Sequence, residues 1–321
     1  MGYFNTISAA PGGALAFRTG SARKEQQFVW FDRTTGREVS RVGEVDDRAP
    51  SQISPSPDGG HLVLGRRGPS GADLWLLEIR RGVLTRFTTD PSEDIFPVWS
   101  RDGSRIVFTS NRNGGFALYQ KRTTGSLSEE LLLPGQPTET FALDADSRFL
   151  IYQHRDTTNG WDIWVLPFDG GKPSPLIHTE ADERDGQLSP DGKGIAYVSN
   201  ESGRFEVYVQ SFPTPGPGPG TRVSTSGGTQ VRWRPDGREL FYVTNDRRLM
   251  AAPVHVASNR KDLEVGVAVP LFATPIGHVL KAGPGADYVV SADGQRFLMN
   301  TIVPNSSPTP IRLVLNWPPR P

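Results

Sequence analysis

Apolar and polar residues alternate at a period of two along most of this chain, and short turn motifs interrupt the alternation. Residues 94–134 show the pattern most clearly, with four short apolar runs separated by an Asp-Gly pair, an Asn- and Gly-rich loop and a polar segment. Alternation at period two is typical of β-strands and does not fit a helix, and an Asp-Gly pair between apolar runs indicates a hairpin. We therefore predict strands at Phe96–Ser100, Arg105–Thr109, Phe116–Lys121 and Glu130–Leu133.

The same turn recurs along the whole chain. Its acidic residues are Asp58, Asp102, Asp146, Asp191, Asp236 and Asp293, at spacings of 44, 44, 45, 45 and 57. Ser147 replaces the Gly after Asp146, and Pro11-Gly12-Gly13 is interpreted as a divergent first copy. This gives seven units, whose second strands we predict at Ala14–Arg18, His61–Leu64, Arg105–Thr109, Arg148–Tyr152, Gly194–Val198, Glu239–Val243 and Arg296–Met299.

A second register of large side chains keeps the same period. These residues fall in the predicted third strands at spacings of 45, 44, 45, 44 and 42, and they are Trp30, Trp75, Tyr119, Trp164, Tyr208 and Met250. A large side chain at one place on each sheet fills the wedge between neighbouring sheets of a ring. We prefer this packing role to a cofactor-binding one.

Units of about 40–45 residues with four strands each indicate a β-propeller. Stacking such sheets in a ring buries both apolar faces of each sheet and protects its hydrogen-bonding edges. The predicted fold class is therefore all-β, a propeller of four-stranded antiparallel blades. Seven blades are favoured because seven units average about 46 residues whereas six would average about 54. Six blades remain the alternative.

We expect one domain over residues 1–321, with no internal boundary. Its units cover residues 1–45, 46–91, 92–136, 137–181, 182–226, 227–285 and 286–321. The last unit supplies only three strands, at Asp287–Val290, Gln295–Asn300 and Ile311–Trp317. We expect this incomplete seventh blade to pack directly on the first, and to lack its outer strand or take it from Tyr3–Ile7.

Two segments interrupt the period. Pro213–Gly220 is rich in Pro and Gly and is predicted to be a stiff surface loop. His255–Gly285 lengthens the sixth unit and accounts for the spacing of 57. Long loops often carry function, but we interpret this one as a simple insertion.

The overall composition excludes several classes of partner. The chain has 35 Lys and Arg against 35 Asp and Glu, and this balance argues against a nucleic-acid partner. It has no Cys, so disulfides and thiolate metal sites are excluded. No apolar run approaches the roughly 18 residues of a membrane-spanning helix, and no signal peptide is visible. We expect a monomer.

Several motifs resemble the WD40-like (PD40) repeats of TolB-type propellers. They are Ile53–Gly59, Leu188–Gly192, Trp233–Gly237, Asp73–Trp75 and Asp162–Trp164. The closing segments Gly294–Leu298 and Pro310–Trp317 resemble the C-terminal propeller of bacterial membrane-anchored serine/threonine protein kinases. This resemblance implies a periplasmic or otherwise extracytoplasmic sensor domain of a larger membrane-anchored protein. Six blades are common among TolB-type proteins, so the predicted seven would be a departure.

Catalytic motifs fail on their context. His154-Arg155-Asp156 matches the catalytic-loop tripeptide of a kinase, but the Asn needed five residues after the Asp is replaced by Trp161. No G-x-S-x-G motif is present, which removes the nucleophile of a propeller-containing peptidase. Hairpin geometry already explains the Asp-Gly turns, so we predict no metal site and no cofactor. The chain itself is predicted not to be an enzyme.

The connections between blades are the predicted ligand site, because they converge on one end of the central channel. They carry four acids and two amides, namely Asp47, Asp94, Glu139, Asp185, Gln187 and Gln230. Such a ring could attract a cation or a basic peptide, or its members could be ordinary solvated loop residues.

The leading function is therefore a non-catalytic sensor propeller that binds a protein, peptide or small ligand. One alternative is a TolB-like periplasmic interaction scaffold. Another is a propeller enzyme of the lactonase or lyase type, with a metal set at the channel mouth.

Overall fold

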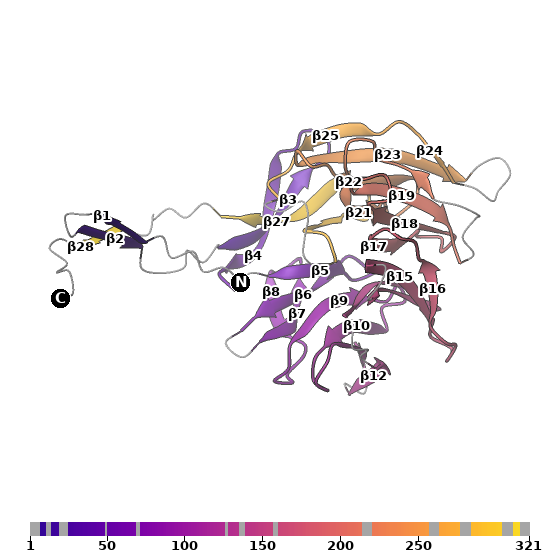
Figure 1. The fold of residues 1–321 in the computed structure, drawn as a ribbon, viewed down its shortest axis with the longest axis horizontal. Coiled ribbons are helices and arrows are strands. Elements are labelled where there is room, and N and C mark those ends of the chain that lie inside the picture. The colour runs from indigo at the N-terminus through magenta and orange to yellow at the C-terminus, as the bar shows by residue number, and fades with distance from the viewer. Residues whose placement is uncertain are drawn as a thin grey trace.

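The structure is a computed structural model, and every element that it describes is a β-strand (Figure 1). It describes residues 7–10, 14–18, 25–48, 50–68, 71–125, 128–134, 139–156, 160–213, 220–256, 263–276, 284–303 and 311–314. Figure 1 shows six sheets in order around a central axis and one small sheet apart from the ring. The predicted all-β propeller of antiparallel blades is confirmed.

Five blades are each built from consecutive strands, beginning with the innermost. Blade 1 contains β5 (Ser51–Pro55), β6 (His61–Arg67), β7 (Ala72–Glu78) and β8 (Val83–Arg86), and blade 2 contains β9 (Asp94–Trp99), β10 (Arg105–Ser110), β11 (Ala117–Arg122) and β12 (Glu129–Leu133). Blade 3 contains β13 (Thr140–Ala145), β14 (Phe149–Asp156), β15 (Gly160–Pro167) and β16 (Ser174–Ile177), and blade 4 contains β17 (Glu183–Leu188), β18 (Gly194–Ser199), β19 (Glu206–Ser211) and β20 (Thr221–Arg222). Blade 5 contains β21 (Thr229–Trp233), β22 (Glu239–Val243), β23 (Arg248–Val256), β24 (Leu263–Val265) and β25 (Val269–Ala273).

The sixth blade combines strands from both ends of the chain. Its order is β26 (Tyr288–Val290), β27 (Arg296–Ile302), β3 (Gln26–Asp32) and β4 (Glu38–Asp46). Strands β27 and β3 pair antiparallel over their whole length, from Arg296 opposite Asp32 to Ile302 opposite Gln26. The first strands of the six blades contact one another around the full ring. The propeller is therefore closed by main-chain hydrogen bonds between N- and C-terminal strands.

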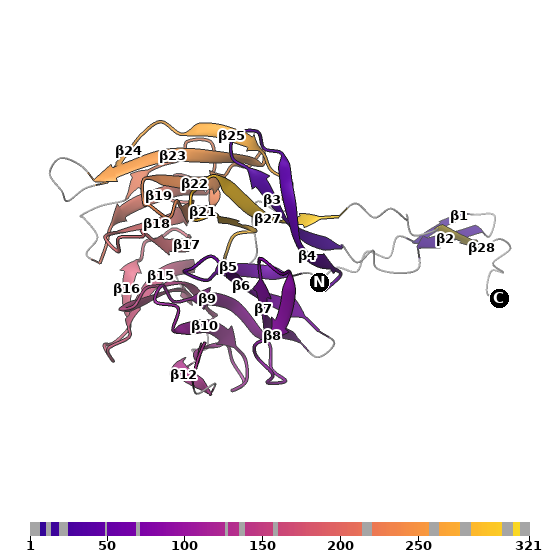
Figure 2. The ribbon, with the colours of Figure 1, turned by 180° about the vertical axis from the view of Figure 1, so that it is seen from behind.

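The prediction of seven blades is wrong, and six blades are present in the described chain. The predicted first-unit strand Ala14–Arg18 exists as β2, but it lies in a three-stranded sheet with β1 (Ile7–Ala10) and β28 (Ile311–Val314). Figure 2 shows this sheet apart from the ring. The two terminal units were each counted as a blade, although each supplies half of one.

The predicted incomplete last blade is also wrong. Pairing of β27 with β3 covers an edge that an unclosed blade would leave open, so the closing blade has four strands and its outer strand is β4. Ile7 belongs to β1, and the rest of the proposed donor strand lies outside the described residues. The expected strand Ile311–Trp317 is described over Ile311–Val314, where β28 pairs with β2.

The core lies between neighbouring blades. Six of its clusters each join two adjacent blades; the one between blades 6 and 1, for example, contains Phe28 and Leu298 against Leu62. Trp75 is half-buried against this cluster, and the Arg66 guanidinium lies 5.0 Å from the centre of its ring. The predicted packing role of the large third-strand side chains is confirmed here.

The repeated turns explain the Asp-Gly signal. At Asp102, the Ser100 hydroxyl donates to Oδ1 at 2.7 Å and the Ser104 amide donates to the same oxygen at 3.0 Å. These bonds lower the pKa of Asp102 against the opposing effect of burial. Gly103 takes a φ of 71°, which L-residues rarely adopt. These side-chain bonds, together with the bond from the Gly103 amide to the Ser100 carbonyl at 2.9 Å, close the turn.

The two irregular segments have different outcomes. Most of the predicted loop Pro213–Gly220 lies outside the described residues. The His255–Gly285 insertion adds a strand to blade 5, because the long strand β23 pairs with β25 along its first half and with β24 at its end. The final residues of this insertion reach the central channel.

Candidate functional site

A cavity of about 370 Å³ lies on the propeller axis. Residues of all six inner strands line it, together with residues of several Asp-Gly turns. The lining uses mainly the second halves of the inner strands, such as Val98 and Trp99 of β9 and Leu188 of β17. The cavity therefore lies toward the Asp-Gly turns rather than toward the connections between blades.

One repeat position forms a ring around this cavity. In each blade it pairs with the residue five positions after the turn Asp, and all six of its residues line the cavity: Ser54, Val98, Asp144, Gln187, Arg232 and Val289. Four of the six are uncharged, and Asp144 of blade 3 is an acid. Arg232 of blade 5 thus places a cation where the other five blades have a neutral side chain or an acid.

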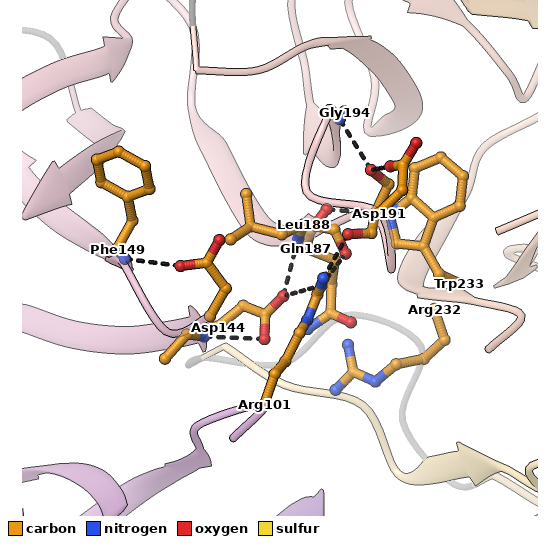
Figure 3. A network of polar contacts seen from close by, with 12 residues as sticks. Arg101, Asp144, Phe149, Gln187, Leu188, Asp191, Gly194, Arg232 and Trp233 are labelled. Atoms are coloured by element: carbon orange, nitrogen blue, oxygen red, sulfur yellow. Dashed lines mark hydrogen bonds and ion pairs between the residues drawn. The ribbon is translucent and has the colours of Figure 1, made fainter. Parts of the chain in front are cut away.

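A second cation, Arg101, also lines the cavity and forms an ion pair with Asp144 (Figure 3). Arg101 donates from Nη1 to the Ser189 carbonyl and from Nη2 to the Leu188 carbonyl, both at 2.5 Å. Its Nη2 also lies 3.4 Å from Asp144 Oδ2, which accepts a hydrogen bond from the Leu188 amide at 2.8 Å. This network joins blades 2, 3 and 4.

The guanidinium of Arg232 is bound differently. It is half-buried, and its Nη1 donates to the carbonyl of its neighbour Val231 at 2.8 Å. Among the described residues, no carboxylate lies within ion-pair distance of it. In Figure 3 it turns toward the side of Arg101 and Gln187, and no dashed line from the residues drawn reaches it. Burial raises the pKa of the nearby Tyr288 hydroxyl, and the Arg232 charge opposes that rise.

Aromatic and proline residues form much of the remaining wall. Trp233 is buried, and its Nε1 donates to the Gln187 carbonyl at 3.0 Å, which fixes the indole across the interface of blades 4 and 5. Pro57, Pro190 and Pro235 line the rim at the position just before the turn Asp. Trp233 and the three prolines thus make this part of the wall apolar and conformationally restricted.

The end of the insertion crosses the channel and forms part of the lining. The Gly285 amide donates to Asp185 Oδ1 of blade 4 at 2.9 Å. A Cβ placed on Gly285 would lie 3.9 Å from Gln52 Cα of blade 1. Blades 1 and 4 lie opposite each other in a six-bladed ring, so this segment spans the axis. Because Pro284 and Gly285 belong to the lining, they form the floor of the cavity.

Four inner strands carry a bulge with a residue other than Gly in the left-handed region. These residues are Gln52, Phe96, Asp185 and Gln230, with φ between 52° and 55°. The register of each inner strand shifts at the bulge. Gln52 Oε1 accepts from the Phe96 amide at 3.0 Å, and Gln230 Oε1 accepts from the Asp287 amide at 2.9 Å. Strained backbone of this kind gathers at functional sites, and here it links neighbouring inner strands.

The structure disperses the six predicted site residues. Asp47 is exposed. Glu139 is also exposed and lies 3.5 Å from Arg155 Nη1. Asp94 is fully buried and accepts from Arg112 Nη2 at 2.9 Å. Its burial raises its pKa against the bonds from Ser110 and Arg112, and we assign it to the blade interior.

The other three predicted residues lie near the axis. Gln187 lines the cavity, and Asp185 and Gln230 hold the segment that crosses the channel. The structure therefore does not bring the six together as one ring. Ligand binding by this set stays a prediction.

Sequence reasoning missed Arg101, Asp144 and Arg232, although a signal was present. Aligned on the turn residue, Arg101 takes a place that Pro occupies in three units, and Asp144 takes a place that Ser occupies in four. Arg232 is the cation of the ring position described above. A comparison of the aligned units at channel-facing positions would have identified all three residues, because each differs there from the residue in most other units.

No group of three or more His, Asp or Glu residues that could hold a metal ion is found in the described part of the chain. The metal set required by the lactonase or lyase alternative is thus not found among those residues. Within the same ranges, no helix has the length and apolar character needed to cross a membrane.

The fold and the axial cavity define the class: a six-bladed β-propeller with a channel site. Residues 14–161 match the PD40 family, the TolB beta propeller domain. The predicted resemblance to TolB-type PD40 propellers is confirmed over these residues.

Known proteins show the same resemblance. The chain is 24% identical to the Tol-Pal system protein TolB of Helicobacter pylori over 173 residues, which cover 50% of this chain and 41% of that protein. It thus spans less than half of that relative. A candidate TolB structure from Agrobacterium tumefaciens has a TM-score of 0.65 at 18% identity, covering 89% of this chain and all of that one. TolB from Acinetobacter baumannii has a TM-score of 0.56 at 15% identity, covering 83% and 82%. At these identities the structures show the fold alone.

Proposed function

We propose that this chain is a non-catalytic interaction propeller, TolB-like in its role, which binds a peptide segment or small ligand in the axial cavity. The observation that carries the proposal is the cavity itself, which all six blades build and which a fixed polar network supports. Its volume lies at the lower end of the range for small-molecule sites. Such a site accepts a side chain, a short peptide end or a small molecule.

The geometry supports entry from one end. Pro284 and Gly285 cross the axis near the first halves of the inner strands, and the Asp-Gly turns surround the other end. A ligand would therefore enter past the turns. The predicted acidic connections lie toward the opposite end and are not required by this proposal.

Two finer predictions from the sequence remain part of the proposal. The resemblance of the closing segments to kinase-associated propellers implies a sensor role within a larger membrane-anchored kinase. It also implies a periplasmic or other extracytoplasmic location. Both depend on the motif resemblance, and sequence encoded upstream of this chain would test them directly.

The binding role can be tested by selecting peptides from a randomised display library on the purified chain. Ala292 is exposed and lines the cavity, so Ala292→Trp narrows the entrance without replacing a buried residue. Val83 is exposed on the outer strand β8, and Val83→Trp is the matched control. We expect the selected peptides to bind the wild type and Val83→Trp equally, and Ala292→Trp at least tenfold more weakly.

Two outcomes would contradict the proposal. One is a selection that yields no peptide above background. The other is a set of peptides that bind Ala292→Trp as tightly as the wild type, because such peptides would occupy another surface.

A further inference from the structure

We propose that the axial cavity binds a carboxylate group and that Arg232 is its charged contact. This inference rests on the proposed function, because it names the chemistry of the ligand in the same cavity. The carboxylate could belong to a small organic acid or to a peptide, as an acidic side chain or a C-terminus.

The charge balance of the cavity is the first argument. Among the described residues, the charged members of its lining are Arg101, Asp144 and Arg232, which leaves one excess positive charge. Asp144 is already occupied, since its two oxygens accept from the Ala145 and Leu188 amides at 2.9 and 2.8 Å and one of them also faces Arg101. The Arg232 guanidinium is therefore left without a counter-ion among the described residues. An anion that enters this half-open cavity would be attracted to Arg232, because charges in a cavity are screened less by water than charges on an open surface.

The repeat supplies an independent argument. Four of the other blades place Ser, Val, Gln or Val at the ring position that Arg232 occupies, and blade 3 places Asp144 there. The fold thus does not require a cation there. A cation at a channel-facing position that is neutral or acidic in the other copies breaks the local pattern in the way that functional residues do.

The surroundings narrow the chemistry to a carboxylate on an apolar body. A guanidinium presents parallel N–H donors that match the two oxygens of a carboxylate. The Gln187 amide occupies the same ring position in the adjacent blade 4, and Trp233 and the rim prolines supply apolar surface. One uncompensated cation in about 370 Å³ suits a single carboxylate better than a polyanion.

The test compares acids with neutral counterparts of the same shape. Benzoate and benzamide probe the small-acid arm, and acetylated, amidated Ala-Ala-Glu and Ala-Ala-Gln probe the peptide arm. Binding is measured by titration of amide chemical shifts, which resolves millimolar affinities. Arg232→Gln introduces the residue that blade 4 carries at the same position, so folding should be retained. Arg122→Gln removes the same charge from an exposed position on β11 and is the control.

We expect at least one acid to bind the wild type and Arg122→Gln with equal affinity and to bind Arg232→Gln at least tenfold more weakly. The wild type should also bind this acid about tenfold more tightly than its neutral counterpart. The arm that responds identifies the source of the carboxylate. Equal binding of acid and neutral probe, an unchanged affinity in Arg232→Gln, or no binding of either acid would each overturn the assignment. In those cases the proposed function would still be supported if the display peptides bind Ala292→Trp at least tenfold more weakly than the wild type.

Discussion

Closure of the ring by β27 and β3 predicts that a disulfide between residues 26 and 302 will form and will stabilise the protein. The amide of Val303 donates to the Glu25 carbonyl at 2.8 Å, so residues 25 and 303 form a hydrogen-bonded pair. The adjacent pair, Gln26 and Ile302, is then a non-hydrogen-bonded pair, in which Cα atoms lie about 4.5 Å apart. That separation is within the range for a disulfide. The natural chain has no Cys, so Gln26→Cys/Ile302→Cys can form only this bond.

The expected magnitude follows from the length of chain that the bond encloses. Residues 26 and 302 are 276 positions apart. The chain-entropy relation gives about 5 to 6 kcal/mol for a loop of this size, and engineered disulfides usually deliver less. We therefore expect the free energy of unfolding to rise by about 2–4 kcal/mol on oxidation.

The assay is urea unfolding of the double variant, oxidised and reduced, with the bond itself identified by mass spectrometry of peptides. Val39→Cys/Ile302→Cys is the control, because Val39 lies on β4 and is separated from β27 by β3. Two strand spacings amount to about 10 Å, beyond the reach of a disulfide. In a seven-bladed ring residues 26 and 302 would lie in different sheets, so failure of the first pair to oxidise would refute the six-bladed closure.

Two further predictions concern single residues. Burial raises the pKa of Glu183 to about 7 from its ordinary 4.5, so its contribution to stability is fully present below pH 4.5 and is lost as the pH rises through 7. Glu183→Gln should reduce the fall in unfolding free energy between pH 4.5 and 7.5 by on the order of 2 kcal/mol, and an unchanged fall would contradict this origin. Gly103→Ala, at a φ of 71°, should lower the free energy of unfolding in urea by about 1–2 kcal/mol. Gly115→Ala should lower it little, because Gly115 has open space around it and no left-handed backbone. Equal effects of the two substitutions would argue against strain at the turn.

The strands were predictable because each signal was local and repeated. The strands predicted at Arg105–Thr109 and Glu239–Val243 appear as β10 and β22, within one residue at each end. Alternation fixes which residues belong to a strand, and the Asp-Gly turn fixes where the strand ends. Both are properties of a few neighbouring residues, so they survive without knowledge of the tertiary structure.

The number of blades depends on a contact that local patterns do not carry. Each of the two registers repeats six times, and the seventh unit came from a Pro-Gly-Gly segment and from the total length. Strand Gln26–Asp32 could belong to a blade of its own unit or to the blade that the last unit begins. Its pairing with Arg296–Ile302 places it in the second of these. That pairing joins residues more than 260 positions apart, and the sequence of either strand alone does not identify its partner strand.

The candidate site shows the same division in a different form. Acids in the connections between blades were expected to face the channel, yet backbone direction sends Asp94 into a blade interior, and Asp185 binds the chain's own Gly285. Whether a residue faces the axis depends on its distance from the turn, because that distance fixes how far along the inner strand the residue lies. At the ring position, Arg232 is the one cation among the described residues. A propeller repeat therefore locates its site best where one copy differs from the others at an axial position, because the shared residues are already explained by the fold.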